Sequence, residues 1–161
     1  MLNQYLMEIS SIDQEVTDFD WYAVDLNGYL VQFSSGGGTL PSSVAASSEA
    51  LVQLTHYFLT LSTETTSTHL NPDLSVLVPH ARNEDAAALY AYRSVNYAKS
   101  GLFAFDKTDL THQDNRYHLV ASPTKPLTLA ELPPAIGALV SRTRLPWAIS
   151  GIATLDANAI E

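Results

Sequence analysis

Residues 20–34 read Asp-Trp-Tyr-Ala-Val-Asp-Leu-Asn-Gly-Tyr-Leu-Val-Gln-Phe-Ser and hold the strongest structural signal of the sequence. Two runs rich in aromatic and β-branched residues, Trp21–Val24 and Tyr29–Phe33, flank a segment that ends in Asn-Gly. An Asn-Gly pair supplies the positive φ angles that a tight hairpin turn requires. Alternation along the second run predicts one face that is more apolar than the other. The stretch therefore predicts a β-hairpin with a left-handed Gly28. The residues that define its structural motif are Trp21, Asp25, Gly28 and Phe33.

Three later segments have helical patterns. Apolar residues recur at spacings of three and four over residues 51–61, which predicts a helix with one buried face and a serine cap at position 47 or 48. Asn83 followed by two acids predicts the start of a second helix, which stops at Gly101. A third helix is expected from Pro133 or Pro134 to about residue 141, because proline is tolerated only in the first helical turn.

Short apolar runs predict the remaining strands. These are Leu74–Val78, Leu102–Phe105 and Tyr117–Ala121, with a final strand within residues 145–160, whereas residues 62–71 are rich in Thr and Ser and resemble a loop. Antiparallel hairpins outnumber βαβ units in this order, so we expect an α+β fold. It consists of an N-terminal β-hairpin and further antiparallel strands packed against about three helices. A length of 161 residues fits a single globular domain over residues 1–161.

The composition excludes several classes of protein. Of the 161 residues, 16% are charged and none is cysteine, and the formal net charge is −9. Without cysteine, a disulfide scaffold and thiolate-ligated metal sites are impossible. Eight Lys and Arg scattered along the chain do not form the basic face of a nucleic-acid-binding protein. No apolar run approaches the roughly 20 residues that cross a bilayer. We expect an acidic, cytoplasmic protein with no nucleic-acid partner, no membrane partner and no cofactor.

The segment from Asp106 to His118 gathers several residue types that bind metals. They are Asp106, Asp109, His112, Asp114 and His118. Their spacing matches neither a calcium loop nor a His-Glu-x-x-His helix, and polar loops between strands are polar because they face water. We predict a solvated loop without a tightly bound metal. The alternative is an enzyme, or a small-ligand or metal-binding domain, that uses this loop.

A glycine-rich segment, Ser34-Ser-Gly-Gly-Gly38, follows the hairpin and precedes a helix, where phosphate-binding loops occur. It lacks the lysine and hydroxyl residue of a nucleotide loop and the Gly-x-Gly-x-x-Gly pattern. There is also no Lys or Arg between Met1 and His80, so an anion bound here would meet a negative field. We predict a flexible exit loop rather than an anion site.

The second predicted helix carries a candidate recognition surface. Tyr90, Tyr92, Arg93 and Tyr97 are of types favoured at the centres of protein interfaces. Core packing of an aromatic-rich helix is the alternative for each tyrosine. No Gly-x-Ser-x-Gly motif occurs, so we assign no catalytic residue.

Two parts of the sequence resemble a group of small bacterial proteins that are encoded near polymorphic toxins, together with their uncharacterised relatives. The first part is residues 21–37, with the pattern aromatic, Ala, x, Asp, x, x, Gly, followed by Phe, two small residues and Gly. The second is residues 98–106, followed by residues 117–123 and Leu132-Pro133. The pattern contains no catalytic residue. The resemblance implies an α+β protein that binds and neutralises a cognate toxin.

The sequence thus favours a non-catalytic protein-binding protein of the immunity type, whose expected partner is a basic toxin domain. The acidic balance agrees with this function because acidic surfaces attract basic partners. Two alternatives stay open. One is the enzyme or ligand-binding domain built on Asp106, Asp109, His112 and His118, and the other is a structural homo-oligomer, suggested by low charge and many tyrosines.

Overall fold

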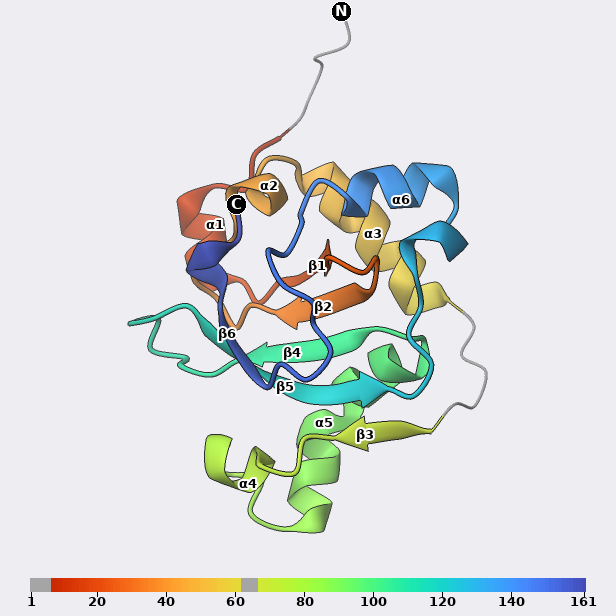
Figure 1. The fold of residues 1–161 in the computed structure, drawn as a ribbon. Helices are drawn as coiled ribbons and strands as arrows, with labels where there is room; N and C mark the ends of the chain where they lie inside the picture. The colour runs from red at the N-terminus through yellow and green to blue at the C-terminus, as the bar shows by residue number, and fades with distance from the viewer. Residues whose placement is uncertain (1–6, 62–66) are drawn as a thin grey trace, which may run out of the picture.

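The chain forms a mixed β-sheet with helices packed around it (Figure 1). The structure is a computed structural model that describes residues 7–61 and 67–161. Five strands follow the order β1-β2-β4-β5-β3, and β6 pairs with the same edge of β5 as β3 does. The strands are β1 (Asp20–Val24), β2 (Leu30–Ser34), β3 (Thr68–Leu70), β4 (Phe103–Lys107), β5 (Arg116–Pro123) and β6 (Thr154–Asp156).

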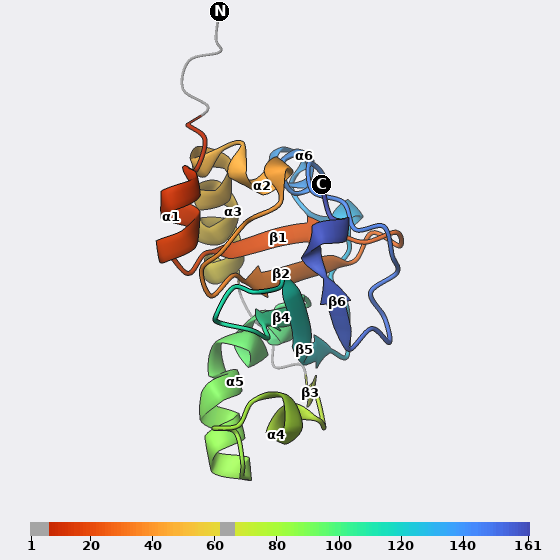
Figure 2. The same cartoon turned by 90° about the vertical axis from the view of Figure 1, so that its left-hand side faces the viewer.

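The helices divide between the two ends of the sheet (Figure 2). Helices α1, α2, α3 and α6 lie around the β1–β2 hairpin, whereas α4 and α5 lie beside β3, β4 and β5. The expected α+β class is confirmed. No helix in the described part of the chain is both long and apolar enough to span a membrane. The helices are α1 (Ser11–Val16), α2 (Ser42–Ala45), α3 (Ser48–Thr60), α4 (Leu74–Leu77), α5 (Glu84–Lys99) and α6 (Pro134–Val140), with 3₁₀ helices at Leu129–Glu131 and Ala157–Ala159.

The three predicted helices are confirmed together with their caps. The Ser47 hydroxyl accepts from the Ala50 amide at 3.1 Å and begins α3. The Asn83 side chain caps α5 in the same way, and Gly101 follows that helix with a φ of +99°. Helix α6 begins at Pro134 and ends at Val140, as the proline rule requires. Local signals were sufficient here because capping acts within a few residues of the helix end.

The predicted hairpin is confirmed, but its turn differs from the expected one. Strands β1 and β2 pair from Asp20↔Ser34 to Val24↔Leu30. The Gly28 amide donates to the Asp25 carbonyl at 3.2 Å, and Gly28 has a φ of +81°. Asn27 has no positive φ, so the expectation that both Asn-Gly residues adopt it is wrong. A single left-handed glycine after the turn is the other common way to close a short hairpin.

Asp25 ties this turn to the C-terminal part of the chain. Its Oδ1 accepts from the amides of Asn27 and Tyr29, each at 2.8 Å, and its Oδ2 accepts from the amide of Ile149 at 2.8 Å. The carboxylate is buried, and hydrogen bonds to a buried charge are stronger than those between neutral groups. The motif residue Asp25 is therefore a structural anchor between segments far apart in the sequence.

The hairpin is buried on both faces. Trp21 stacks on Phe33 with ring centroids 4.0 Å apart, and both contact Tyr117 of β5. Tyr22 on the opposite face packs against Phe58 of α3 and Tyr97 of α5. Even the polar Gln32 is only 1% exposed, so the expected contrast between an apolar and a polar strand face does not appear as a contrast in burial. Helices cover one face, and the C-terminal segment crosses in front of the other (Figure 1).

Strands β2 and β4 are parallel, whereas we expected antiparallel pairing throughout. Their register runs from Val31↔Phe103 to Ser34↔Asp106, while the other strand pairs are antiparallel. A parallel pair needs a long crossover, and here it contains α2, α3, α4, α5 and β3. The two strands consequently end at the same edge of the sheet.

Residues 68–78 correct the expected order of elements. The predicted strand at Leu74–Val78 is instead the single-turn helix α4, and Val76 is 81% exposed on it. Strand β3 pairs with β5 instead, and it lies in the segment 62–71 that was expected to be a loop. Residues 62–66 of that segment lie outside the described residues. The Asn71 side chain ends this strand, because its Oδ1 accepts from the Asp73 amide at 3.0 Å and so starts a turn.

We predict that Gly28→Val lowers the free energy of unfolding by more than about 1 kcal/mol, because a β-branched residue is strained at positive φ. The added Cβ would have its nearest neighbour at 3.9 Å, so the loss would come from the backbone and not from a clash. Urea denaturation of Gly28→Val and Gly28→Asn measures it, since asparagine tolerates this conformation. Equal midpoints for the two variants would contradict the proposed strain.

Candidate functional site

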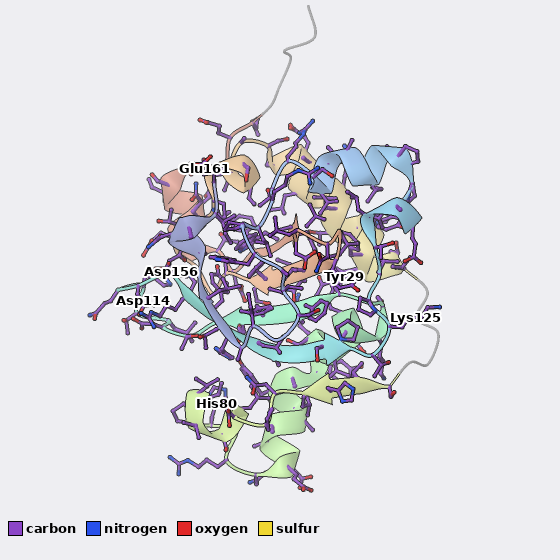
Figure 3. All side chains as sticks on the ribbon, in the orientation of Figure 1. Tyr29, His80, Asp114, Lys125, Asp156 and Glu161 are labelled. Atoms are coloured by element: carbon purple, nitrogen blue, oxygen red, sulfur yellow. The ribbon has the colours of Figure 1, made fainter. Side chains whose placement is uncertain are left out.

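The parallel pairing of β2 and β4 gathers three segments at one edge of the sheet. Ser34 and Asp106 are paired, so residues 35–39 leave β2 beside residues 108–115, which leave β4. Because β1 is antiparallel to β2, the residues before Asp20 reach the same edge. Asp114 lies there, on the side opposite to Tyr29 at the hairpin turn (Figure 3). Lys107, His112 and Asp114 lie at or near this edge and line one pocket.

Lys107 is a buried cation at the end of β4. It is 3% exposed, and its Nζ donates to Asn115 Oδ1 at 2.6 Å and lies 4.9 Å from the centre of the Tyr117 ring. It forms no ion pair with any carboxylate of residues 7–61 or 67–161. Burial lowers the pKa of Lys107, although nearby acids, Asp114 and Glu15 foremost, oppose that shift.

His112 joins the loop after β4 to α1 and to the glycine-rich loop. Its Nδ1 lies 2.6 Å from Glu15 Oε1, and its Nε2 lies 3.0 Å from the carbonyl oxygen of Gly36. Both partners are acceptors, so the protonated imidazole satisfies both contacts by donating from each nitrogen. The Glu15 hydrogen bond, followed by that to Gly36, raises the pKa of His112.

A second histidine lies in a buried polar network. The Tyr90 hydroxyl contacts the Asp106 carboxylate and lies 3.0 Å from His118 Nε2, while His118 Nδ1 lies 2.9 Å from the Thr108 hydroxyl. Burial lowers the pKa of His118 to about 4 and raises the pKa of Asp106, although the Tyr90 hydrogen bond lowers the latter. An acid, a phenol and a neutral imidazole are thus in contact. They line none of the three cavities described below.

Asp20 organises a third cluster, between β1 and α5. Its Oδ2 accepts from Arg93 Nη2 and from the Tyr97 hydroxyl, each at 2.7 Å, and the Tyr97 hydroxyl is 2.8 Å from that of Tyr22. Desolvation is the main reason why the pKa of Tyr22 is raised to about 12 and that of Tyr97 is raised as well. The cluster fixes α5 against the hairpin.

The four residues proposed for recognition do not form one surface. Tyr90 and Tyr97 turn toward the sheet and belong to the two networks just described. Tyr92 is 67% exposed, and the Arg93 side chain is largely exposed above Asp20. Helical spacing through Leu89 and Tyr92 predicted the helix, but these two side chains are 82% and 67% exposed. The buried side of α5 carries Ala91, Ser94 and Tyr97 instead. The role of the four proposed residues in binding a partner stays a prediction.

The metal-binding residue types of the loop between β4 and β5 are also separated. Asp106 and His118 belong to the buried network, His112 pairs with Glu15, and Asp109 accepts from Thr111. Within the described residues, no three His, Asp or Glu side chains are grouped so that they could hold a metal ion. The prediction of a loop without tightly bound metal still requires a metal analysis.

The glycine-rich loop has cationic neighbours that the sequence did not reveal. A Cβ on Gly37 would lie 2.7 Å from the Glu15 carbonyl oxygen and 2.9 Å from His112 Cε1. A Cβ on Gly38 would lie 3.4 Å from Lys107 Nζ. The absence of Lys and Arg before residue 81 predicted a negative field at this loop, but the fold brings Lys107 to it from β4.

Three cavities open near these clusters. The largest, about 570 Å³, is the α3 groove, and a second of about 330 Å³ lies between α3 and α5 and shares Leu59 and Arg93 with it. The third, about 230 Å³, is the lysine pocket. The α3 groove is lined by Ile9, Asp18, Phe19, Asp20, Ser48, Leu51, Val52, Thr55, His56, Leu59, Thr60 and Arg93. The lysine pocket is lined by Glu15, Gly38, Thr39, Lys107, His112, Gln113, Asp114, Asn115 and Asn158.

Comparison with protein-family models, curated proteins and solved structures finds no match to this chain.

We predict that His118 and His112 titrate on opposite sides of the ordinary histidine pKa of 6.5, with His118 near a pKa of 4 and His112 above 6.5. Glu15→Gln should return His112 toward 6.5, because it removes the partner that favours the imidazolium. The Glu15–His112 contact therefore stabilises the fold below pH 6.5, and this contribution is lost as the pH rises through the raised pKa. Imidazole ¹H–¹⁵N NMR measures both groups. A His112 pKa that Glu15→Gln leaves unchanged would refute the assignment.

Proposed function

We propose that the chain is a non-catalytic protein-binding protein whose partner is a basic protein, and that it acts as an immunity protein against a cognate toxin. The observation that carries the proposal is the α3 groove, an apolar cavity of about 570 Å³ with an acidic rim. The sequence resemblance and the acidic balance of the chain agree with it.

The apolar part of the α3 groove suits a protein partner. Val52 and Leu59 are seven residues apart, so they lie on the same face of α3, and they are 67% and 58% exposed. Both line the cavity, with Phe19 of the segment before β1 on its other wall. Large apolar side chains gathered around a concavity are typical of interaction sites, because burying them on association is favourable.

The charge around the α3 groove suits a basic partner. Glu8 and Asp13 are exposed in the segment that precedes Asp18, and Asp18 and Asp20 line the groove. Arg93 is its only Lys or Arg, and it already pairs with Asp20. An acidic rim would attract a basic protein and accelerate its association, an effect that salt weakens.

The enzyme alternative has weaker support in the geometry. Asp106, Tyr90 and His118 form a network of titratable side chains with shifted pKa values, but they line none of the three cavities described. His112 and Asp109 are engaged elsewhere. A structural network that fixes α5 to β4 and β5 accounts for the set.

The test is co-expression with the product of the adjacent gene, followed by affinity measurement at two salt concentrations. We expect a complex that weakens with salt, and Val52→Glu should weaken it at least about tenfold, because a charge would replace an apolar contact in the groove. Val76→Glu is the matched control, since Val76 is also a highly exposed valine and lies on α4 at the other end of the molecule (Figure 2). Its complex should keep its affinity.

Three results would overturn the proposal. The first is equal weakening by Val52→Glu and Val76→Glu, which would place the contact elsewhere. The second is a dimer of the chain alone that Val52→Glu dissociates, because the α3 groove would then seat a second copy. The third is turnover of a substrate by the purified chain with no partner retained at low salt.

A further inference from the structure

Lys107 lacks the partner that a buried cation normally has. An ammonium group has three donors, and the only hydrogen bond that Lys107 Nζ makes within the described residues is to Asn115 Oδ1. Moving a charge out of water is costly unless an opposite charge or a full set of hydrogen bonds compensates for it. The Tyr117 ring compensates in part through a cation–π contact. Asn115 in turn holds the C-terminal 3₁₀ helix through Asn158, so it is fixed in place.

The lysine pocket offers further donors beside this cation. Gly38 and Thr39 line it, and neither amide makes a hydrogen bond to another described residue. Gly38 has a φ of +93°, and a Cβ added to it would lie 3.4 Å from Lys107 Nζ and 3.5 Å from the His112 ring, so the backbone approaches both closely. A cation and backbone amides in one concavity form the typical setting for a bound carboxylate or phosphate.

The pocket also carries two carboxylates, Glu15 and Asp114. Glu15 is paired with His112, whereas Asp114 is exposed and forms no ion pair with a described residue. A bare anion would be repelled by these acids and by the net charge of −9. A ligand with both signs of charge would meet an opposite charge on each side.

We propose that the lysine pocket binds a small zwitterion of the size of a free amino acid, with its carboxylate on Lys107 and its ammonium group on Asp114. The pocket volume of about 230 Å³ is sufficient for a short-chain amino acid. This site is separate from the α3 groove and does not depend on the proposed partner.

The test is a ¹H–¹⁵N NMR titration of the full chain with L-alanine, and with acetate, methylammonium and inorganic phosphate in separate arms. We expect L-alanine to shift the Gly38 and Thr39 amide signals saturably and to raise the melting temperature. Acetate and methylammonium should each bind at least about tenfold more weakly, because each satisfies one side of the pocket only.

Two variants assign the contacts. Lys107→Met should abolish the shifts, and Lys125→Met, which removes an exposed lysine between β5 and the first 3₁₀ helix, should keep them. Asp114→Asn keeps the acceptor for the Arg116 amide, so the variant should fold. It should weaken the binding of L-alanine about tenfold and strengthen the binding of acetate. Asp114→Asn therefore tests the proposed contacts even if Lys107→Met does not fold.

The results that would overturn the zwitterion site differ from those that would overturn the proposed protein partner. Absence of a saturable shift with L-alanine would refute the proposal. An affinity for L-alanine that Asp114→Asn leaves unchanged would refute it too. Tighter binding of phosphate than of L-alanine would identify an oxyanion site and reject the zwitterion. None of these results bears on Val52 or the α3 groove.

Discussion

The parallel pairing of β2 with β4 is the constraint on which the rest of the molecule depends. It joins the N-terminal hairpin to the second half of the sheet through Phe33 and Phe105, whose ring centroids are 5.5 Å apart. Parallel strands end at the same edge, so the glycine-rich loop after β2 meets the loop after β4. An antiparallel pair would place these loops at opposite edges. The lysine pocket and the contacts of His112 exist because of this single topological choice.

Buried polar groups hold the elements around that sheet in place. Asp25 accepts three amides from the turn and from Ile149, Asp20 accepts from two residues of α5, and Asp106 meets Tyr90 of the same helix. In each case the carboxylate accepts at least one hydrogen bond from a distant part of the chain, which is what makes its partial or full burial tolerable. Lys107 differs, because an amide oxygen and an aromatic face are its only direct polar contacts among the described residues, and no carboxylate there pairs with it.

The sequence predicted the elements whose signals are local. The hairpin, α3, α5 and α6 follow from alternation, helical spacing and caps that act over a few residues. Helix α1 has no buried residue and so no apolar periodicity to detect, while β3 and α4 are too short for a pattern to distinguish strand from helix. The pairing of β2 with β4 spans about seventy residues of crossover, and no local signal encodes it. For the same reason no local signal placed Lys107 beside Gly38, and the sequence did not reveal the lysine pocket.

The segment at α1 forms a wall of both candidate sites. Glu15 lines the lysine pocket and holds His112, whereas Asp18, three residues later, lines the α3 groove and accepts from the Gly36 amide at 2.8 Å. A substitution at either acid therefore acts on the glycine-rich loop as well as on the surface it faces. Val52 and Asp114 lack this ambiguity, because each lines one cavity and neither contacts α1 through a hydrogen bond. For that reason they, and not the acids of α1, separate protein binding at the groove from ligand binding at the pocket.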